Sequence, residues 1–337
     1  MTAIHDFRAD FPVFTHHPDL VYLDSTSTTQ KPQAVIDRLS LYLSSEYANI
    51  HRGAYSLSER SEELYAASKE AIKNLIHARS TSEIMYTANA TAAANLLTLS
   101  FTRSGWLRRG DRIILSILEH HANIVPWQIA AEQVGAEIVF VPITAEYELD
   151  MTTYEALITP NTRVISITGA SNVTGTIPNW SEITRIARDC ERLRSDGNPL
   201  YLVMDASQVV PHAELDVTAL DLDFAFFTGH KMWADSGIGV LYGRRELLKT
   251  MSPGTSGGGA INSVTEEGFE PAGLPFRFEA GTPNMSGAVS LLAAVEYLES
   301  IGGYPVLAQQ ESGLNEYVLE QVCKLPSSVR LIGSMQS

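Results

Sequence analysis

The hydrophobic residues of this chain form short apolar runs that alternate with longer amphipathic stretches. Runs such as Arg112 to Ile117, Arg163 to Thr168 and Phe224 to Phe227 are typical of buried strands. Apolar residues three or four positions apart, as in the long stretch that ends near Ile76, are typical of helices. Because strands and helices alternate, the pattern predicts βαβ units and a mostly parallel sheet.

The same pattern predicts the individual elements. We expect strands over residues 20–24, 84–87, 112–117, 136–141, 163–168, 202–204, 224–227 and 239–242, the last as an antiparallel partner. We expect a helix that begins at Pro32 and has one apolar face (Val35, Ile36, Leu39, Leu43), followed by a long amphipathic helix that ends at about residue 76. Further helices are expected over residues 92–99, 289–298 and 309–325. The Gly-rich residues 253–275 are predicted to be a long loop.

Composition restricts the functional class of this 337-residue chain. Hydrophobic residues make up 45% and charged residues 19%, which is the balance of a soluble globular protein. A net charge of −15 disfavours nucleic acid and anionic membranes as partners. Two cysteines, Cys190 and Cys323, form no disulfide framework, and both are predicted to pack among apolar residues. With no signal peptide and no apolar run of membrane-spanning length, we expect a cytoplasmic protein.

Four chemically capable residues follow predicted strands, at the point where each strand ends. They are His120, Asn172, Asp205 and Lys231. The carboxyl ends of parallel strands share one edge of a sheet, which is the usual place for a ligand. The sequence therefore predicts a site at this edge.

A lysine amine at such an edge suggests the aldehyde cofactor pyridoxal 5'-phosphate (PLP). Asp205 is placed to keep the pyridine nitrogen of PLP protonated, and His120 to lie over the ring and relay protons. The phenolic oxygen needs a donor, for which Gln208 and Asn172 are candidates. The phosphate needs hydroxyls and the N–H groups of a helix start; Thr91 opens a helix, and Thr228 and His230 flank the lysine. The alternatives are a solvated Lys231, a helix N-cap role for Asp205 and simple loop packing for His120.

Other motifs carry less weight. Residues 254–258 match the nucleophile-elbow pattern of hydrolases, but neither a strand nor a helix flanks them. The pairs His16-His17 and His120-His121 lack helical spacing and a matching carboxylate, so no metal site is predicted.

Several motifs resemble the SufS/CsdA-type cysteine desulfurases, which are class-V aminotransferase-like enzymes of PLP fold type I. The resemblance runs from about Asp10 to the end of the chain. It rests on Tyr22-Leu23-Asp24 with Gln30-Lys31-Pro32, Asn49-Ile50-His51-Arg52-Gly53, Glu119-His120-His121-Ala122-Asn123-Ile124-Val125-Pro126-Trp127-Gln128, Ser171-Asn172-Val173-Thr174-Gly175, Asp205-Ala206-Ser207-Gln208, Thr228-Gly229-His230-Lys231 and Arg277-Phe278-Glu279-Ala280-Gly281-Thr282-Pro283-Asn284.

The resemblance implies a role for each site residue. Lys231 would hold PLP, Asp205 would pair with the pyridine nitrogen and His120 would stack on the ring. The remaining cofactor contacts would come from Asn172 and Gln208 at the phenolic oxygen, Thr91, Thr228 and His230 at the phosphate, and Thr282 reaching the site of a partner subunit in a homodimer.

The resemblance also implies the reaction, in which L-cysteine becomes L-alanine and its sulfur forms a persulfide for iron–sulfur cluster assembly or another sulfur-acceptor protein. The family continues beyond the position of Ser337 with the persulfide cysteine and an arginine that binds the substrate carboxylate. We therefore expect little desulfuration by this chain alone. The alternatives are another PLP-dependent lyase or epimerase of the class-V family, or an inactive PLP-binding homologue.

The fold class expected on this basis is α/β. Residues 21–262 would form a three-layer α/β/α large domain, and residues 263–337 a linker and the start of an incomplete small α+β domain. Residues 1–20 would pack on the small domain.

Overall fold

The computed structural model describes residues 7–50, 53–193, 197–326 and 328–333. His51 and Arg52 of the predicted Asn49–Gly53 motif lie outside the described residues. Within the described ranges, a central seven-stranded sheet has the order β1-β7-β6-β5-β4-β2-β3. Its strands are β1 (Ile84–Thr87), β2 (Arg112–Ser116), β3 (Glu137–Val141), β4 (Thr162–Thr168), β5 (Tyr201–Asp205), β6 (Phe224–Thr228) and β7 (Gly239–Gly243).

The sheet is parallel except for β7, which pairs antiparallel with both β1 and β6. Strands β4, β5 and β6 are buried along their whole length, which explains why they appear in the sequence as continuous apolar runs. Thr168 at the end of β4 pairs with Asp205 at the end of β5. The register therefore places the ends of the central strands at one edge. The predicted mostly parallel α/β sheet with an antiparallel β7 is confirmed.

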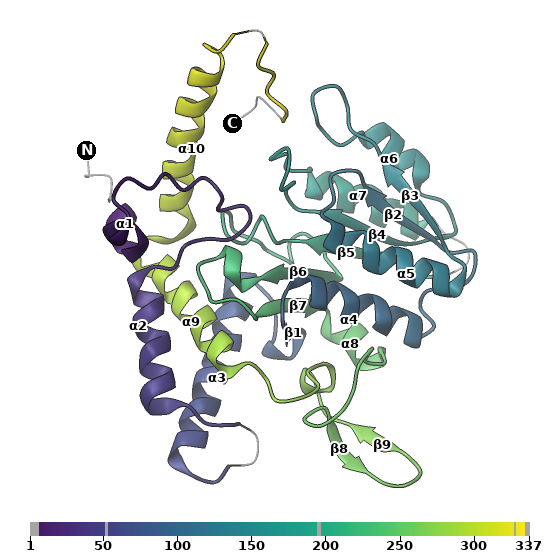
Figure 1. The fold of residues 1–337 in the computed structure, drawn as a ribbon. Coiled ribbons are helices and arrows are strands. Elements are labelled where there is room, and N and C mark those ends of the chain that lie inside the picture. The colour runs from purple at the N-terminus through teal and green to yellow at the C-terminus, as the bar shows by residue number, and fades with distance from the viewer. Residues whose placement is uncertain (1–6, 51–52, 194–196, 327, 334–337) are drawn as a thin grey trace.

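Helices cover both faces of the sheet, and Figure 1 shows α4 and α5 lying across one of them. Phe101 of α4, Trp127 of α5 and Leu248 of α8 belong to one hydrophobic core, whereas Ile72 of α3 and Ile183 of α7 belong to the other. The helices are α1 (Pro12–His16), α2 (Gln33–Leu41), α3 (Ser56–Leu75), α4 (Ala90–Arg103), α5 (Val125–Val134), α6 (Met151–Leu157), α7 (Trp180–Arg192), α8 (Arg245–Thr250), α9 (Met285–Ser300) and α10 (Gly303–Val322).

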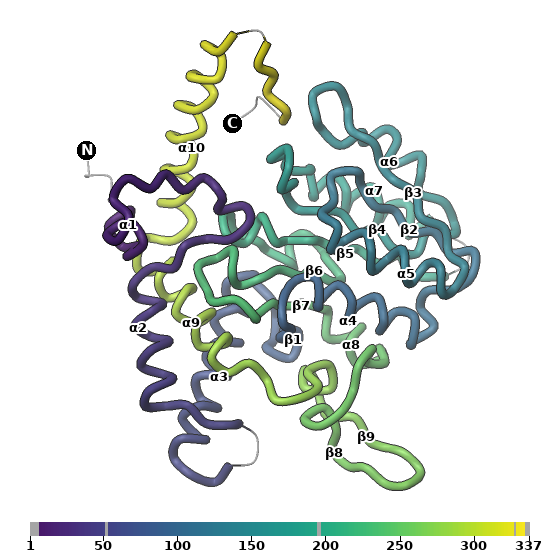
Figure 2. The backbone as a smooth tube through the Cα atoms, viewed as in Figure 1, coloured from purple at the N-terminus to yellow at the C-terminus, as the bar shows by residue number. Residues whose placement is uncertain are grey.

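Helices α2, α3 and α9 lie side by side, and α10 leads away from the sheet (Figure 2). The N-terminal segment contacts α9, since the hydroxyl of Tyr297 donates to Asp10 Oδ2 (2.8 Å) and its ring packs edge-on against Phe11. The division of the chain at residue 262 stays a prediction. Among the described residues, no helix is long and apolar enough to cross a bilayer.

Three local predictions are wrong. Residues 20–24 form no strand, and Val21 and Leu23 are exposed, because no neighbouring strand pairs with this segment. The predicted loop 253–275 contains a two-stranded antiparallel hairpin, β8 (Ile261–Val264) and β9 (Phe269–Pro271). Of the apolar face predicted for α2, only Val35 is buried.

The two cysteines differ in environment. Cys190 packs against the core as predicted, and burial raises the pKa of its thiol. Cys323 is exposed beside the end of α10, so its predicted packing is wrong. The apolar residues Val318 and Leu325 near that end of the helix are exposed as well, so they form no buried surface around the thiol.

Candidate active site

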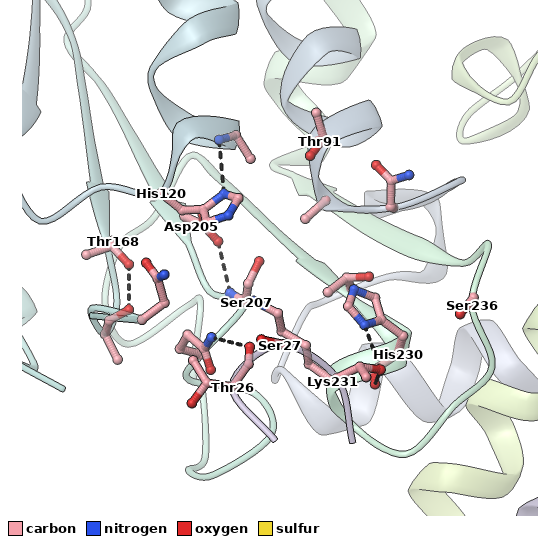
Figure 3. Close-up of a pocket in the computed structure, with 18 of the residues that line it drawn as sticks. Thr26, Ser27, Thr91, His120, Thr168, Asp205, Ser207, His230, Lys231 and Ser236 are labelled. Atoms are coloured by element: carbon pink, nitrogen blue, oxygen red, sulfur yellow. Dashed lines mark hydrogen bonds between the residues drawn. The ribbon is translucent and has the colours of Figure 1, made fainter. Parts of the chain in front are cut away.

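A cavity of about 790 Å³ opens at the carboxyl edge of the sheet. Figure 3 shows His120 and Asp205 on one side of it, His230 and Lys231 on the other, and Ser207 between them. Eight of the nine residues predicted for the site line this cavity, namely Thr91, His120, Asn172, Asp205, Gln208, Thr228, His230 and Lys231. The strand ends bring them together from positions far apart in the chain.

Thr282 is the predicted site residue that does not line this cavity. It lines two adjoining hollows instead, one of them with Gly281, Pro283 and Asn49. Its predicted contact with the site of a partner subunit stays a prediction.

Lys231 ends a short 3-10 turn, η5 (Gly229–Lys231), that directly follows β6. Burial lowers the pKa of its amine, and the nearby charge of Asp205 acts in the opposite direction. The amine makes no hydrogen bond or ion pair to any described residue. Such an amine is partly desolvated and free to react, which disfavours the solvated surface lysine that the sequence left open.

Asp205 ends β5 and is almost fully buried. Burial raises the pKa of its carboxyl, while hydrogen bonding from Ser207 and the charge of Lys231 act to lower it. The backbone N–H of Ser207 donates to Asp205 Oδ1 (3.0 Å), but residues 207–212 form turns rather than a helix. The alternative of a helix N-cap is therefore wrong, and a buried acid faces the cavity.

His120 is held in one orientation by the turn that follows it. The backbone N–H of Ala122 donates to His120 Nδ1 (3.1 Å), so the proton of the neutral ring lies on Nε2. Burial lowers the pKa of this imidazole, and the charge of Lys231 lowers it further, although Asp205 raises it. The neutral ring is thus the main form at pH 7.

Next to His120 in the chain is the buried carboxyl of Glu119, which the sequence did not single out. It accepts hydrogen bonds from Ser116 Oγ, Asn123 Nδ2 (2.7 Å) and the backbone N–H of Thr168 (2.8 Å). Burial raises its pKa to about 8, to which the charge of Asp205 contributes. Glu119 therefore ties the ends of β2 and β4 together beneath the cavity.

One buried hydroxyl in the cavity wall has no hydrogen-bond partner among the described residues. Thr228 Oγ1 is almost inaccessible to solvent and hydrogen-bonds to none of them. An unsatisfied buried hydroxyl is costly, so this group is expected to meet a polar atom of a ligand. Ser207 is also buried, and its hydrogen bonding to Asp205 helps to lower the pKa of that carboxyl.

The residues present fit PLP. Among the described residues, an unpaired amine, a buried carboxyl and the unpaired Thr228 hydroxyl line one cavity. The N-terminus of α4 also faces this cavity through Ala90 and Thr91, where the helix dipole favours a phosphate. Asn172 lines the cavity from the loop after β4, and Gln208 does so while its Nε2 donates to Thr26 O (3.0 Å).

The loop that carries Thr282 is anchored by a buried ion pair that the sequence did not indicate. Glu279 Oε1 lies 2.6 Å from Lys69 Nζ, and both side chains are almost fully buried. The Tyr65 hydroxyl (3.1 Å) and the backbone N–H of Tyr86 (2.5 Å) also donate to the Glu279 carboxylate.

Comparisons with known proteins agree with this geometry. The family model for aminotransferase class-V matches residues 21–336. A cysteine desulfurase of Yersinia pestis is 40% identical over 328 residues, which are 96% of this chain and 78% of the relative.

Solved structures are also similar. The crystal structure of the cysteine desulfurase CsdA from Escherichia coli matches with 35% sequence identity and a TM-score of 0.84. The match covers 95% of this chain and 77% of the CsdA chain. The apo structure of the cysteine desulfurase from Thermococcus onnurineus NA1 matches with 32% sequence identity and a TM-score of 0.86. This match covers 96% of this chain and 78% of the Thermococcus chain.

Proposed function

The chain belongs to the class-V aminotransferase family of PLP-dependent enzymes, and on this premise we propose that it acts as a cysteine desulfurase on L-cysteine. The observation that carries the proposal is the cavity in which an unpaired, partly desolvated lysine lies with a buried aspartate and a neutral histidine. The names of the relatives that are 32–40% identical support cysteine as the substrate.

The proposal assigns the cofactor contacts as follows. Lys231 would hold PLP covalently, and Asp205 would keep a proton at the pyridine nitrogen. His120 would lie against the cofactor ring, and Asn172 and Gln208 would contact the phenolic oxygen. Thr91, Thr228 and His230 would bind the phosphate, and the Thr228 hydroxyl, which hydrogen-bonds to no described residue, is the strongest support for this placement.

Bound PLP supplies an electron sink for the carbon that loses its proton. The Lys231 amine would take the proton from the substrate α-carbon, and its lowered pKa favours the neutral form that can do so. The neutral His120 ring presents Nε2–H to the cavity and can give or accept a proton there. In the overall reaction a thiol would attack the cysteine sulfur and keep it as a persulfide. The electron pair of the broken C–S bond would stay with carbon, which would take a proton to give alanine.

The cavity does not supply the thiol that would accept the sulfur. Neither Cys190 nor Cys323 lines it. We infer that the acceptor thiol belongs to another segment or protein. The same observation favours a second candidate, a PLP-dependent lyase of the same family that uses Lys231 and Asp205 but no thiol.

Two measurements test these candidates. PLP added to the purified chain is expected to give the visible absorbance band of a lysine-bound cofactor, and Lys231→Ala is expected to lose it. A wild-type chain without the band would contradict the cofactor assignment. With a thiol reductant as acceptor, alanine formed from L-cysteine supports the desulfurase, whereas pyruvate and sulfide support the lyase.

We further propose a cytoplasmic homodimer that serves a sulfur-acceptor protein, with iron–sulfur cluster assembly as its process. Thr282, which lines two adjoining hollows with Gly281, would reach the cofactor of the partner subunit. Sedimentation analysis of the purified chain tests the dimer, and a monomer at micromolar concentration would contradict it.

A further inference from the structure

The segment from Thr28 to Lys31 lies against the lysine turn, and its donors converge on one carbonyl oxygen. The oxygen of His230 faces the Thr29 N–H (3.1 Å), the Thr29 hydroxyl (3.0 Å) and Lys31 Nζ (3.1 Å). The Thr28 hydroxyl lies 3.2 Å from the same oxygen. The peptide group directly before Lys231 is therefore held by a segment about 200 residues earlier in the sequence.

The far side of the turn is strained. Trp233 has a φ of 67°, in the left-handed region that bulky residues avoid, at a cost of about 1–3 kcal/mol. Its backbone N–H donates to Thr29 Oγ1 (2.9 Å), and its ring packs edge-on against Tyr297 of α9. One hydroxyl, that of Thr29, thus accepts from the residue two positions after Lys231 and donates to the residue before it.

The position of the Lys231 amine depends on this backbone, because no described residue hydrogen-bonds to the amine. We propose that Thr29 is a positioning residue that locks the turn around Lys231 and so presents the amine to the cofactor cavity. The proposal rests on the proposed function for what the amine does, but the positioning itself is a property of the chain without cofactor.

The charges around the amine make the positioning measurable. Asp205, His120 and His230 all interact electrostatically with Lys231, and Lys31 lies beyond His230 with its pKa lowered to about 8 by burial. Burial is the main reason that the pKa of Lys231 is lowered. If the turn loosens, the amine gains water and its pKa rises toward the ordinary value of about 10.4.

The first test uses the full chain without PLP. The rate at which acetic anhydride acetylates Lys231 is followed against pH by mass spectrometry in wild type, Thr29→Val and Thr29→Ser. The valine variant has the same shape without the hydroxyl, and we expect its profile to shift to higher pH, whereas serine keeps both bonds and should match wild type. Thr29→Ala gives the same comparison if the valine variant does not fold.

A matched control separates positioning from general stability. Thr184 on α7 is buried and donates one hydroxyl hydrogen bond to Leu220 O (3.0 Å), and neither residue lines the cavity. Thr184→Val is expected to lower the thermal midpoint but to leave the acetylation profile of Lys231 unchanged.

The second test adds PLP. Thr29→Val is expected to raise the apparent Kd for PLP about tenfold, the effect of losing one well-placed hydrogen bond, and Thr29→Ser to restore it. An unchanged acetylation profile together with an unchanged Kd in Thr29→Val would overturn the proposal. If wild type binds no PLP, the proposed function fails, and the acetylation profile still decides whether Thr29 positions the amine.

Discussion

The buried ion pair between Lys69 and Glu279 gives the sharpest prediction on stability. The Glu279 carboxylate accepts three hydrogen bonds, from Lys69 Nζ, the Tyr65 hydroxyl and the Tyr86 N–H, whereas Lys69 Nζ donates to Glu279 and Ile84 O. Glu279→Gln keeps the size of the side chain but leaves the Lys69 ammonium buried without a counter-charge. Removing one partner of a buried pair costs about 3–5 kcal/mol.

The loss expected for Glu279→Gln is large relative to the total free energy of unfolding. Folded proteins are stable by about 5–15 kcal/mol, so a loss of about 3–5 kcal/mol should remove roughly a fifth or more of the free energy of unfolding. Lys69→Met should cost less, because the carboxylate keeps two donors, Tyr65 and Tyr86. The double variant should be more stable than the sum of the two single losses predicts.

Equilibrium urea unfolding of wild type, both single variants and the double variant measures these differences and the coupling energy. A loss below about 1 kcal/mol for Glu279→Gln, a typical value for an exposed pair, would refute the burial argument. So would a coupling energy near zero, since the two side chains would then act independently.

Two further predictions concern the cavity and the network below it. Thr228→Val removes a buried hydroxyl that hydrogen-bonds to no described residue, so we expect the chain without PLP to become more stable by about 1 kcal/mol and PLP to bind more weakly. Urea unfolding and PLP titration measure the two effects. A less stable chain without PLP would count against this prediction. Glu119 has a folded pKa of about 8, above its unfolded value of about 4.3, so the native state binds the extra proton and stability falls as pH rises between these values. Glu119→Gln should remove up to about 1.4 kcal/mol per pH unit from this slope, and equal slopes in the variant and wild type would be inconsistent with a protonated Glu119.

The central sheet and most of the cavity could be predicted from the sequence. The runs that became β4, β5 and β6 are buried on both faces, so their apolar residues are continuous and easily recognised. The parallel direction of the strands then places whatever follows each of them at one edge, which is why Asp205 and Lys231 could be assigned to a common site.

Other features depended on contacts between distant segments. Residues 20–24 have the composition of a strand but find no partner strand, and the hairpin at 261–271 forms from a stretch with little periodicity. Hydrophobic periodicity reports burial on one face of an element, and it contains no information about which element lies opposite.

The same reason separates the roles of single residues. The roles of Lys231 and Asp205 could be predicted from the sequence, because their chemistry and their position at the end of a strand are local properties. Only the tertiary structure decided that Glu279 pairs with Lys69 and that Thr29 bonds on both sides of Lys231, since these partners are about 200 residues apart. It also decided that Thr228 has an unpaired hydroxyl. The hydrogen bonds and the burial of a residue depend on all of its neighbours in space, so they are set only once the chain has folded.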